Sequence, residues 1–347
     1  MERRFDIDWL RVIAIGLLLI YHISIAFQPW GVFIGFIQND DSMEWIWTPM
    51  SMLNIWRIPL LFFVSGMGIY FAMQRRDWKQ LLLERSKRIL VPFLFGVVTI
   101  VPLQILIWQH NYHQDIHYVA NPAHLWFLGN IFSYVLLVFP LFIYLKNRPD
   151  GKFQRALSKL LKYPAGLLLI TLPFILEAEL IQPKNFELYA MTMHGFWLGL
   201  IAFSTGFLCV FAGESFWQTV TKWKWGLLGM AFSVYIVRVM IFNLRTPDFA
   251  MAIESNLWTF TILGFGHAYL NRPSKALSYL SQAAYPVYLI HILFLFIGSW
   301  LFFGLSLPPL VKFLLLNLFT LGACLLVYEG VIRRVKWLRP WFGLKGL

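Results

Sequence analysis

Three ionisable residues fall on one face of the first apolar segment of the chain. Asp8, Arg11 and His22 bracket a run that is otherwise almost entirely apolar or glycine. An α-helix turns about 100° and rises about 1.5 Å per residue, so Arg11 and His22 lie within about 20° of one face and about 16 Å apart. Asp8 lies one turn before Arg11, within reach of a charge-assisted bond. Ionisable groups inside an apolar segment are costly and mark candidate sites.

These three side chains suit proton transfer beside a bound anion. A histidine removed from water favours its neutral form, which can take a proton from a hydroxyl or attack a carbonyl carbon itself. A guanidinium can bind a phosphate or polarise a carbonyl oxygen. The simpler alternative is that Arg11 anchors the helix at the membrane surface and His22 is a polar residue near the opposite interface.

The composition places most of the chain in lipid. Of 347 residues, 59% are hydrophobic and only 13% are charged, which is more apolar surface than a soluble domain of this size can bury. Although the net charge is +12, no basic stripe interleaves with aromatic positions of a soluble segment, which argues against nucleic acid as a partner. Cys209 and Cys324 both lie in apolar runs and give neither a disulfide framework nor a metal-binding spacing.

The apolar runs predict an all-α integral membrane protein with about ten transmembrane helices. The predicted spans cover 9–28, 51–73, 89–108, 125–145, 163–182, 190–212, 224–243, 251–270, 281–303 and 308–331. No cleavage pattern follows the first span, so we expect that helix to be retained. The whole chain, 1–347, is expected to form one membrane domain with a core at about 5–332 and no separate soluble domain.

Charge alternates between the loops that join these spans. Lysine and arginine gather before the first span, after the second, fourth, sixth and eighth, and in the tail, whereas the other loops hold only Lys184 and Arg245. Because cytoplasmic loops carry the excess of Lys and Arg, both termini are expected in the cytoplasm. The face that carries Arg11 and His22 then runs from the cytoplasmic end of the first helix toward the far side.

Two further basic sites lie in or beside the second and third spans. Arg57 is a cation within the second span, and Ser65 follows in a cluster with small residues, for which close helix packing is the simpler explanation. Arg85 and Arg88 are three residues apart at the start of the third span, where they can clamp phosphates or act as ordinary membrane anchors.

The remaining candidates are polar residues near the expected outer ends of the helices. They are His124, Trp126, Glu177 and His291. Trp126 also suits an interfacial aromatic belt, and His291 suits a hydrogen-bonded packing role. His110, His113 and His117 can share a helix face and bind zinc, but no Cys or Glu completes a familiar ligand pattern, and we predict no metal site.

Taken in order, these motifs resemble the membrane acyltransferase 3 family. The matching motifs are Asp8-x-x-Arg11 with His22, Phe62-Phe63-Val64-Ser65-Gly66, Arg85-x-x-Arg88 and Tyr288-Leu289-Ile290-His291. Arg57-Ile58-Pro59 and His124-Leu125-Trp126-Phe127-Leu128 look more like the branch of periplasmic glucan succinyltransferases than the lipopolysaccharide O-acetylases. The chain departs from the family at Met67, where an aromatic residue is usual. We also expect no appended esterase-like domain.

The resemblance implies transfer of an acyl group, acetyl or succinyl, from cytoplasmic acyl-CoA to a hydroxyl of an extracytoplasmic or lipid-linked carbohydrate. His22 would be the general base or would carry the acyl group itself, and Arg11, positioned by Asp8, would bind a CoA phosphate or polarise the thioester. Arg85 and Arg88 would bind CoA phosphates.

The other implied roles concern the rest of the donor and the acceptor. Arg57 would pair with a succinyl carboxylate, and Ser65 would contact acyl-CoA. His124, Trp126, Glu177 and His291 would face the acceptor. Acyl-CoA is expected as a co-substrate with no bound cofactor, in the inner membrane of a bacterium. The oligomeric state is open, and a homo-oligomer is compatible with the sequence.

Two other functions compete with acyl transfer. In a secondary transporter, Asp8, Arg11, His22, Arg57 and Arg238 would form a proton or substrate pathway. Against that class, the sequence has no paired halves with matching broken helices, and the basic pair at 85 and 88 has no obvious use in a carrier. A catalytically silent membrane partner of a polysaccharide assembly machine is the third class. Release of free CoA thiol from acyl-CoA separates the enzyme from both.

Overall fold

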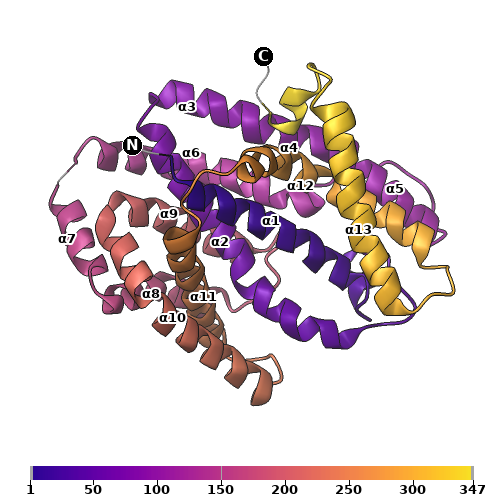
Figure 1. The fold of residues 1–347 in the computed structure, drawn as a ribbon, viewed down its shortest axis with the longest axis horizontal. Helices are drawn as coiled ribbons and strands as arrows, with labels where there is room; N and C mark the ends of the chain where they lie inside the picture. Colours follow the sequence, from indigo (N-terminus) through magenta and orange to yellow (C-terminus); the bar gives the residue numbers. More distant parts are fainter. Residues whose placement is uncertain (1–2, 150, 345–347) are drawn as a thin grey trace. The chain divides into compact units, whose positions relative to one another are not determined.

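The computed structural model describes residues 3–149 and 151–344, which form helices and connecting segments without any strand (Figure 1). The α-helices are α1 (Phe5–Ile25), α2 (Trp47–Met73), α3 (Trp78–Arg85), α4 (Val91–Phe95), α5 (Val101–Asn111), α6 (Trp126–Lys146), α7 (Lys152–Leu161), α8 (Pro164–Ile181), α9 (Met193–Phe211), α10 (Glu214–Met240), α11 (Asp248–Tyr269), α12 (Lys275–Phe302) and α13 (Pro309–Val327). The predicted all-α class is confirmed. Residues 1–2, 150 and 345–347 of the expected domain lie outside the described residues.

Eight described helical segments are long and apolar enough to cross a membrane. They are Phe5–Ile25, Glu44–Met73, Trp78–Asn111, Ala123–Lys146, Pro164–Ile181, Met193–Phe211, Lys275–Phe302 and Pro309–Ile332. The helices α10 and α11 lie over the predicted seventh and eighth spans but are not among these eight. A count of ten spans, like the cytoplasmic position of the termini, therefore stays a prediction.

Two basic regions that the sequence analysis placed in loops contain helix. α10 begins at Glu214, so it includes Lys222 and Lys224, which were expected to precede the seventh span. The basic segment between the fourth and fifth predicted spans contains the short helix α7. Apolar content marks the membrane-buried part of a helix, whereas backbone hydrogen bonding continues into its polar ends, which explains why hydropathy missed these residues.

The contacts within the chain group into two compact units, each made of three separate segments. The first unit contains Met1–Ala14, Ser51–Leu83 and Asn130–Ser274, and the second contains Ile15–Met50, Glu84–Gly129 and Lys275–Leu347. The boundary falls inside α1, so Arg11 belongs to the first unit and His22 to the second. The expectation of a single domain stays a prediction, and each unit is described by itself.

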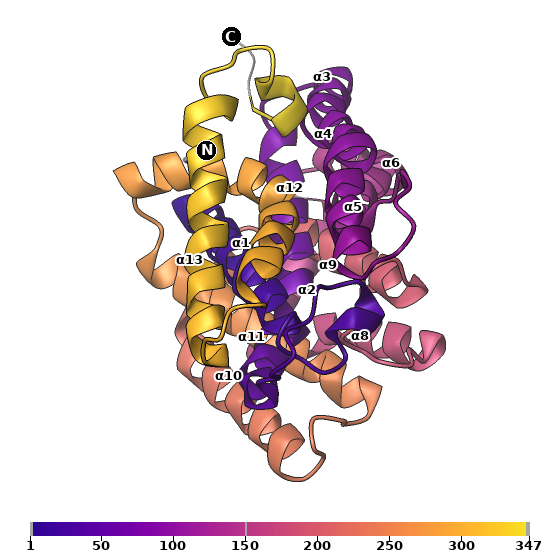
Figure 2. The same ribbon diagram turned by 90° about the vertical axis from the view of Figure 1, so that its right-hand side faces the viewer.

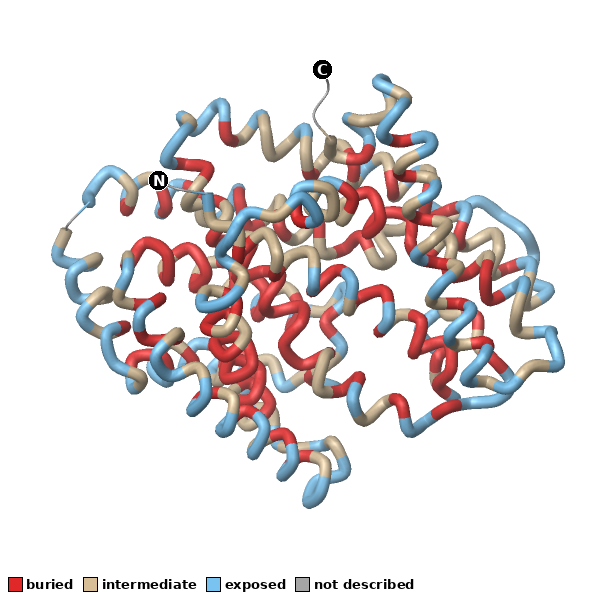
Figure 3. The backbone as a smooth tube through the Cα atoms, in the orientation of Figure 1, coloured by how far each residue is buried: buried red, intermediate tan, exposed pale blue. Residues whose placement is uncertain are grey.

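Close helix packing builds the first unit. α10 and α11 lie side by side, and α11 is buried along most of its length (Figures 1 and 3). Gly66 of α2 lies against the backbone carbonyl of Phe203 of α9, and Gly206 of α9 lies against the carbonyl of Phe63, so a Cβ at either glycine would overlap backbone. Small residues that allow such backbone approach are the usual contacts between membrane helices, which confirms the packing role expected for Gly66.

An ionic and aromatic cluster attaches the start of α1 to the first unit. Arg4 donates hydrogen bonds to both carboxylate oxygens of Asp6, at 3.0 and 2.6 Å, and its guanidinium lies 3.8 Å from the centre of the Trp217 ring. His267 of α11 lies 3.3 Å from the Asp6 carboxylate. The fully buried Asp6 carboxylate thus joins α1 to α11, and Arg4 links it to Trp217 of α10.

The second unit contains two wide turns in the helix that runs from Trp78 to Asn111. These π-helical turns, η3 (Ser86–Leu90) and η4 (Gly96–Ile100), each end two residues before a proline, Pro92 and Pro102. Proline lacks an N–H and clashes with the carbonyl four residues earlier, and a wider turn relieves both problems. Figure 2 shows α12 and α13, the last two long helices of this unit, side by side.

Candidate functional site

Two histidines from distant parts of the chain form a direct pair in the second unit. Nδ1 of His22 on α1 lies 2.8 Å from Nε2 of His291 on α12, and the two rings stack with 5.1 Å between centroids and 9° between planes. His291 is fully buried and His22 is half-buried. The pair therefore has a protected member and a more accessible one.

A backbone carbonyl fixes the tautomers of this pair. Nδ1 of His291 lies 2.6 Å from the carbonyl oxygen of Tyr288, one turn earlier on α12. A carbonyl can only accept a hydrogen bond, so Nδ1 of His291 carries the proton and Nε2 of the neutral ring is an acceptor. His22 must then donate from Nδ1 to His291. In neutral His22 the lone pair is left on Nε2, the nitrogen suited to act as a base.

His124 completes a cluster of three histidines around α12. Its Nε2 lies 3.2 Å from the carbonyl oxygen of Leu289, and the Tyr288 hydroxyl donates a 2.6 Å hydrogen bond to the carbonyl oxygen of His124. The His124 ring meets the His291 ring nearly at right angles, at 85° and 5.1 Å between centroids. His22, His124 and His291, the three-histidine cluster, are the predicted residues that the structure brings together.

Residues of the motif Tyr288-Leu289-Ile290-His291 hold the three-histidine cluster together. Tyr288 supplies the carbonyl that fixes His291 and the hydroxyl that holds His124, and the Leu289 carbonyl accepts from His124. The structure thus gives His291 an imidazole partner in addition to the packing role considered from the sequence.

Trp126, another expected acceptor-side residue, is buried. Its ring lies edge-on to that of Phe127, with 6.4 Å between the ring centroids.

The carboxylate of Asp8 is shared between two arginines in the first unit. Arg11 Nη1 lies 3.6 Å from Asp8 Oδ1, which is an ion pair longer than a hydrogen bond. Arg3 donates two hydrogen bonds to the other oxygen, at 3.1 and 2.8 Å. The expected pairing of Asp8 with Arg11 is present, but Arg3 is the more tightly bound partner. α1 is one unbroken helix from Phe5 to Ile25, as the spacing of Asp8, Arg11 and His22 predicted.

A buried ionic cluster of the first unit surrounds Arg238. This side chain is fully buried and contacts Glu254 twice, at 2.8 and 3.0 Å, and Glu187 at 2.9 Å. Asn54 donates to the carbonyl oxygen of Glu187 and accepts a 3.3 Å hydrogen bond from Arg57. Burial raises the pKa of the Glu187 carboxyl to about 7, and the positive charge of Arg238 opposes that rise.

Glu177, an expected acceptor-side residue, forms its own pair in the first unit. Both carboxylate oxygens lie near Nδ1 of His194, at 2.9 and 3.0 Å, and both side chains are buried. Nε2 of His194 lies 3.0 Å from the carbonyl oxygen of Phe186 and donates to it. The pair connects α8 and α9 to the segment between them.

The expected donor-side residues lie in different surroundings. Arg88 lies in the π-helical turn η3 of the second unit, is partly exposed and pairs with Glu84 at 3.4 Å. Arg85 is the last residue of α3, directly before that turn. In the first unit, Ser65 donates a 2.7 Å hydrogen bond to the Leu61 carbonyl of its own helix.

Comparison with known families decides the class of the protein. A family model described as an acyltransferase domain, that of the acyltransferase 3 family, matches residues 4–329. The chain belongs to the acyltransferase 3 family. No curated protein and no solved structure matches the chain. Together with its apolar helices, the match makes this protein a membrane acyltransferase.

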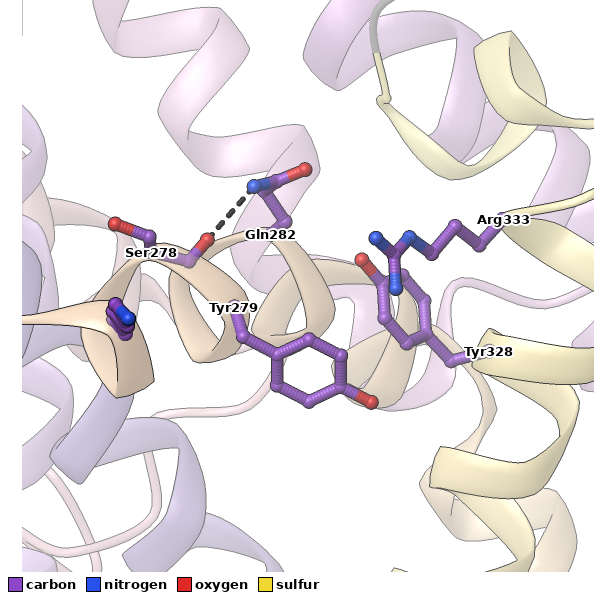
Figure 4. Close-up of a pocket in the computed structure, with 6 residues that line it drawn as sticks. Ser278, Tyr279, Gln282, Tyr328 and Arg333 are labelled. Atoms are coloured by element: carbon purple, nitrogen blue, oxygen red, sulfur yellow. Dashed lines mark hydrogen bonds between the residues drawn. The ribbon is translucent and has the colours of Figure 1, made fainter.

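A small pocket of this acyltransferase lies in the second unit, about 300 Å³ in volume. Its lining comprises Lys275, Ser278, Tyr279, Gln282, Tyr328 and Arg333 (Figure 4). Arg333 pairs with both carboxylate oxygens of Glu329, at 2.8 and 2.9 Å, which offsets its charge. Tyr279 precedes His291 by twelve positions on α12, or about 18 Å of helix. The pocket is thus separate from the three-histidine cluster.

The histidine-rich segment after α5 does not form the helix face considered for zinc. α5 ends at Asn111, so His113 and His117 lie beyond the helix and do not share a face with His110. Within residues 3–149 and 151–344, no group of three or more His, Cys, Asp or Glu side chains is arranged to hold a metal ion.

Sequence reasoning singled out Arg238 but missed Glu187 and Glu254, which surround it. It also missed His194, the partner of Glu177, and the pair of Arg4 and Asp6. A usable signal existed for Glu254, because a carboxylate inside an apolar helix requires a cation, and Arg238 was the evident candidate.

Arg238→Gln should strongly destabilise the acyltransferase, because it leaves the buried carboxylates of Glu187 and Glu254 without their cation. Removal of one member of a buried ion pair costs about 3–5 kcal/mol. Thermal unfolding of the detergent-purified protein measures the loss. Arg245→Gln, the same substitution at an exposed arginine, should leave the transition unchanged. Equal transitions for both variants would contradict a structural role for the cluster.

Proposed function

We propose that this membrane acyltransferase moves an acetyl or succinyl group from acyl-CoA to a hydroxyl of a carbohydrate or glycolipid acceptor. The donor would enter from the expected cytoplasmic side and the acceptor from the opposite side. The observation that carries the proposal is the 2.8 Å contact between His22 Nδ1 and His291 Nε2, together with the Tyr288 carbonyl behind it. This arrangement gives a partly accessible imidazole an oriented lone pair on Nε2.

The reaction requires a base for the attacking hydroxyl, because a thioester is already reactive toward attack at its carbonyl carbon. Nε2 of His22 takes the proton of the attacking hydroxyl as its oxygen bonds to the thioester carbonyl carbon. The tetrahedral intermediate then expels the CoA thiolate, which takes up a proton to give free CoA, and the ester remains on the acceptor. The same lone pair can attack the thioester first, which would form an acyl-histidine before transfer to the hydroxyl.

His291 acts in this scheme as a positioning residue. Its Nε2 accepts from His22 Nδ1, which holds the ring in one orientation and in one tautomer. When His22 takes up the proton, its Nδ1–H remains bonded to a neutral imidazole, so the positive charge keeps a hydrogen-bond acceptor on its half-buried ring.

Basic residues would recognise the donor. Arg85 and Arg88 lie at the start of the long helix that contains η3 and η4, where guanidinium groups suit the phosphates of CoA. Arg11, with Asp8 beside it, would bind a phosphate or polarise the thioester carbonyl. Ser65 would contact acyl-CoA only by giving up or sharing its bond to Leu61.

Arg57 would select a donor that carries a second carboxylate. Its side chain is buried and bonded to Asn54, in a region of the first unit that also contains Arg238. A guanidinium in a low-dielectric environment favours a carboxylate partner over a methyl group. This role supports succinyl in preference to acetyl as the transferred group.

His22→Gln should abolish most of the acyl-CoA-dependent activity. Loss of a general base reduces the rate by about 10²–10⁴-fold. The assay is release of free CoA thiol by the purified protein, with incorporation of radiolabelled acyl groups into membrane glycans. His110→Gln, at an exposed histidine, should retain wild-type rates. A wild-type protein that releases no CoA above background would refute the enzyme proposal and favour the transporter.

Replacement of His291 should lower the rate by loosening the orientation of His22. His291→Leu removes the acceptor of His22 Nδ1–H, and loss of orientation lowers the rate on the order of 10²-fold. His291→Gln keeps a carbonyl acceptor and should recover part of that loss. The assay is the release of free CoA thiol by equal amounts of folded protein. Equal rates for the Leu and Gln variants would reduce His291 to packing.

Arg57→Ala should impair succinyl transfer at least tenfold more than acetyl transfer, because only the succinyl group loses a charge-assisted bond. The ratio of the two rates in one preparation is independent of how much protein folds. The same substitution at Arg245, which is exposed, provides the control. Equal losses with both donors would show that Arg57 does not bind the acyl carboxylate.

A further inference from the structure

One buried nitrogen of the three-histidine cluster has an unused lone pair. Nδ1 of His124 is buried and meets no hydrogen-bond partner among the residues that the structure describes. Buried polar atoms of native proteins nearly always have a partner, in the protein, in water or in a ligand. The atom therefore calls for a partner from outside the chain.

The contact made by the other ring nitrogen, Nε2, decides whether Nδ1 is a donor or an acceptor. Nε2 of His124 lies 3.2 Å from the Leu289 carbonyl oxygen, which can only accept, so Nε2 carries the proton. In neutral His124 the lone pair is then on Nδ1. The missing partner must be a hydrogen-bond donor.

The ring is held in this orientation by more than one contact. The Tyr288 hydroxyl donates to the His124 carbonyl oxygen at 2.6 Å, and the rings of Tyr288 and His291 pack against the imidazole at 5.8 and 5.1 Å. The preceding residue, Ala123, has a φ of 40°, a left-handed conformation that is unfavourable for alanine. Asn121 stabilises it by accepting from the Ala123 N–H at 2.7 Å.

We infer that Nδ1 of His124 binds a second hydroxyl of the acceptor while the reacting hydroxyl loses its proton to His22. This inference rests on the proposed acyl transfer. Both imidazoles pack against His291 at the same centroid distance of 5.1 Å, one stacked and one edge-on. An acceptor with more than one hydroxyl can engage both imidazoles. The ligand class is a polyol, and an acceptor with one isolated hydroxyl should be a poor substrate.

Two substitutions at His124 separate the acceptor contact from the structural bond. The amide of His124→Gln reaches the position of Nε2 and can keep the bond to Leu289, but it leaves Nδ1 without a replacement. The amide of His124→Asn lies nearer the position of Nδ1 and restores an acceptor there, while the bond to Leu289 is lost. A merely structural role would favour the Gln variant, and an acceptor-binding role favours the Asn variant.

The experiment measures acyl transfer to methyl glucoside, to its monodeoxy derivatives and to ethanol. Acyl-CoA hydrolysis without an acceptor serves as the donor-side readout. In wild type, removal of the hydroxyl that binds His124 should raise the acceptor KM about tenfold, and the monodeoxy series identifies that hydroxyl. In His124→Gln, the KM for methyl glucoside should rise by a similar factor, and the deoxy derivative should cost nothing further. In His124→Asn, which restores an acceptor near the position of Nδ1, the deoxy derivative should again raise the KM.

Several results would overturn the inference. They are equal KM values for wild type and His124→Gln, additive losses from the variant and the deoxy acceptor, or transfer to ethanol as efficient as to methyl glucoside. CoA release without transfer to methyl glucoside would also refute it and leave the donor chemistry intact. Absence of CoA release from wild type would instead refute the proposed function.

Discussion

The candidate site depends on a single hydrogen bond, from Nδ1 of His291 to the carbonyl oxygen of Tyr288. Because a helix carbonyl cannot donate, this bond decides where the protons of two imidazoles lie. His291 must accept from His22, and the basic lone pair of His22 is thereby assigned to Nε2. A carboxylate often orients a catalytic histidine, but it would carry a charge into an apolar bundle. A neutral imidazole backed by a backbone carbonyl performs the same orientation without that charge.

The rest of the cluster is built on the same turn of α12. Tyr288 holds the His124 carbonyl with its hydroxyl, and the Leu289 carbonyl orients the His124 ring. Contacts from Tyr288, Leu289 and His291, which lie on one helical turn, therefore hold His124 and His22, which lie far away in the sequence. Rigid elements hold reacting groups more accurately than loops do. His124 lies in a short helical turn before α6, and its contacts with α12 hold it in place.

The first unit uses ionisable groups differently. Arg238 contacts both Glu187 and Glu254 almost entirely out of water, and Glu177 and His194 form a separate buried pair. Such pairs cost desolvation and hold only where geometry and extra hydrogen bonds compensate, as Asn54 does for the backbone of Glu187. Their positions between helices and connecting segments favour a structural role, in contrast to the half-buried His22.

The sequence by itself determined the helical class, the position of most helices, the family and the presence of His22, His124 and His291 as polar residues in apolar surroundings. Hydropathy and motif order are local properties, and a chain in lipid must satisfy its backbone by helix formation wherever it is apolar. Only the tertiary structure decided that His291 pairs with His22, that Arg3 competes with Arg11 for Asp8, and that His113 lies outside a helix. Each of these depends on contacts between residues far apart in the chain or on the residue at which a helix ends, and periodicity along one segment carries no information about which faces meet.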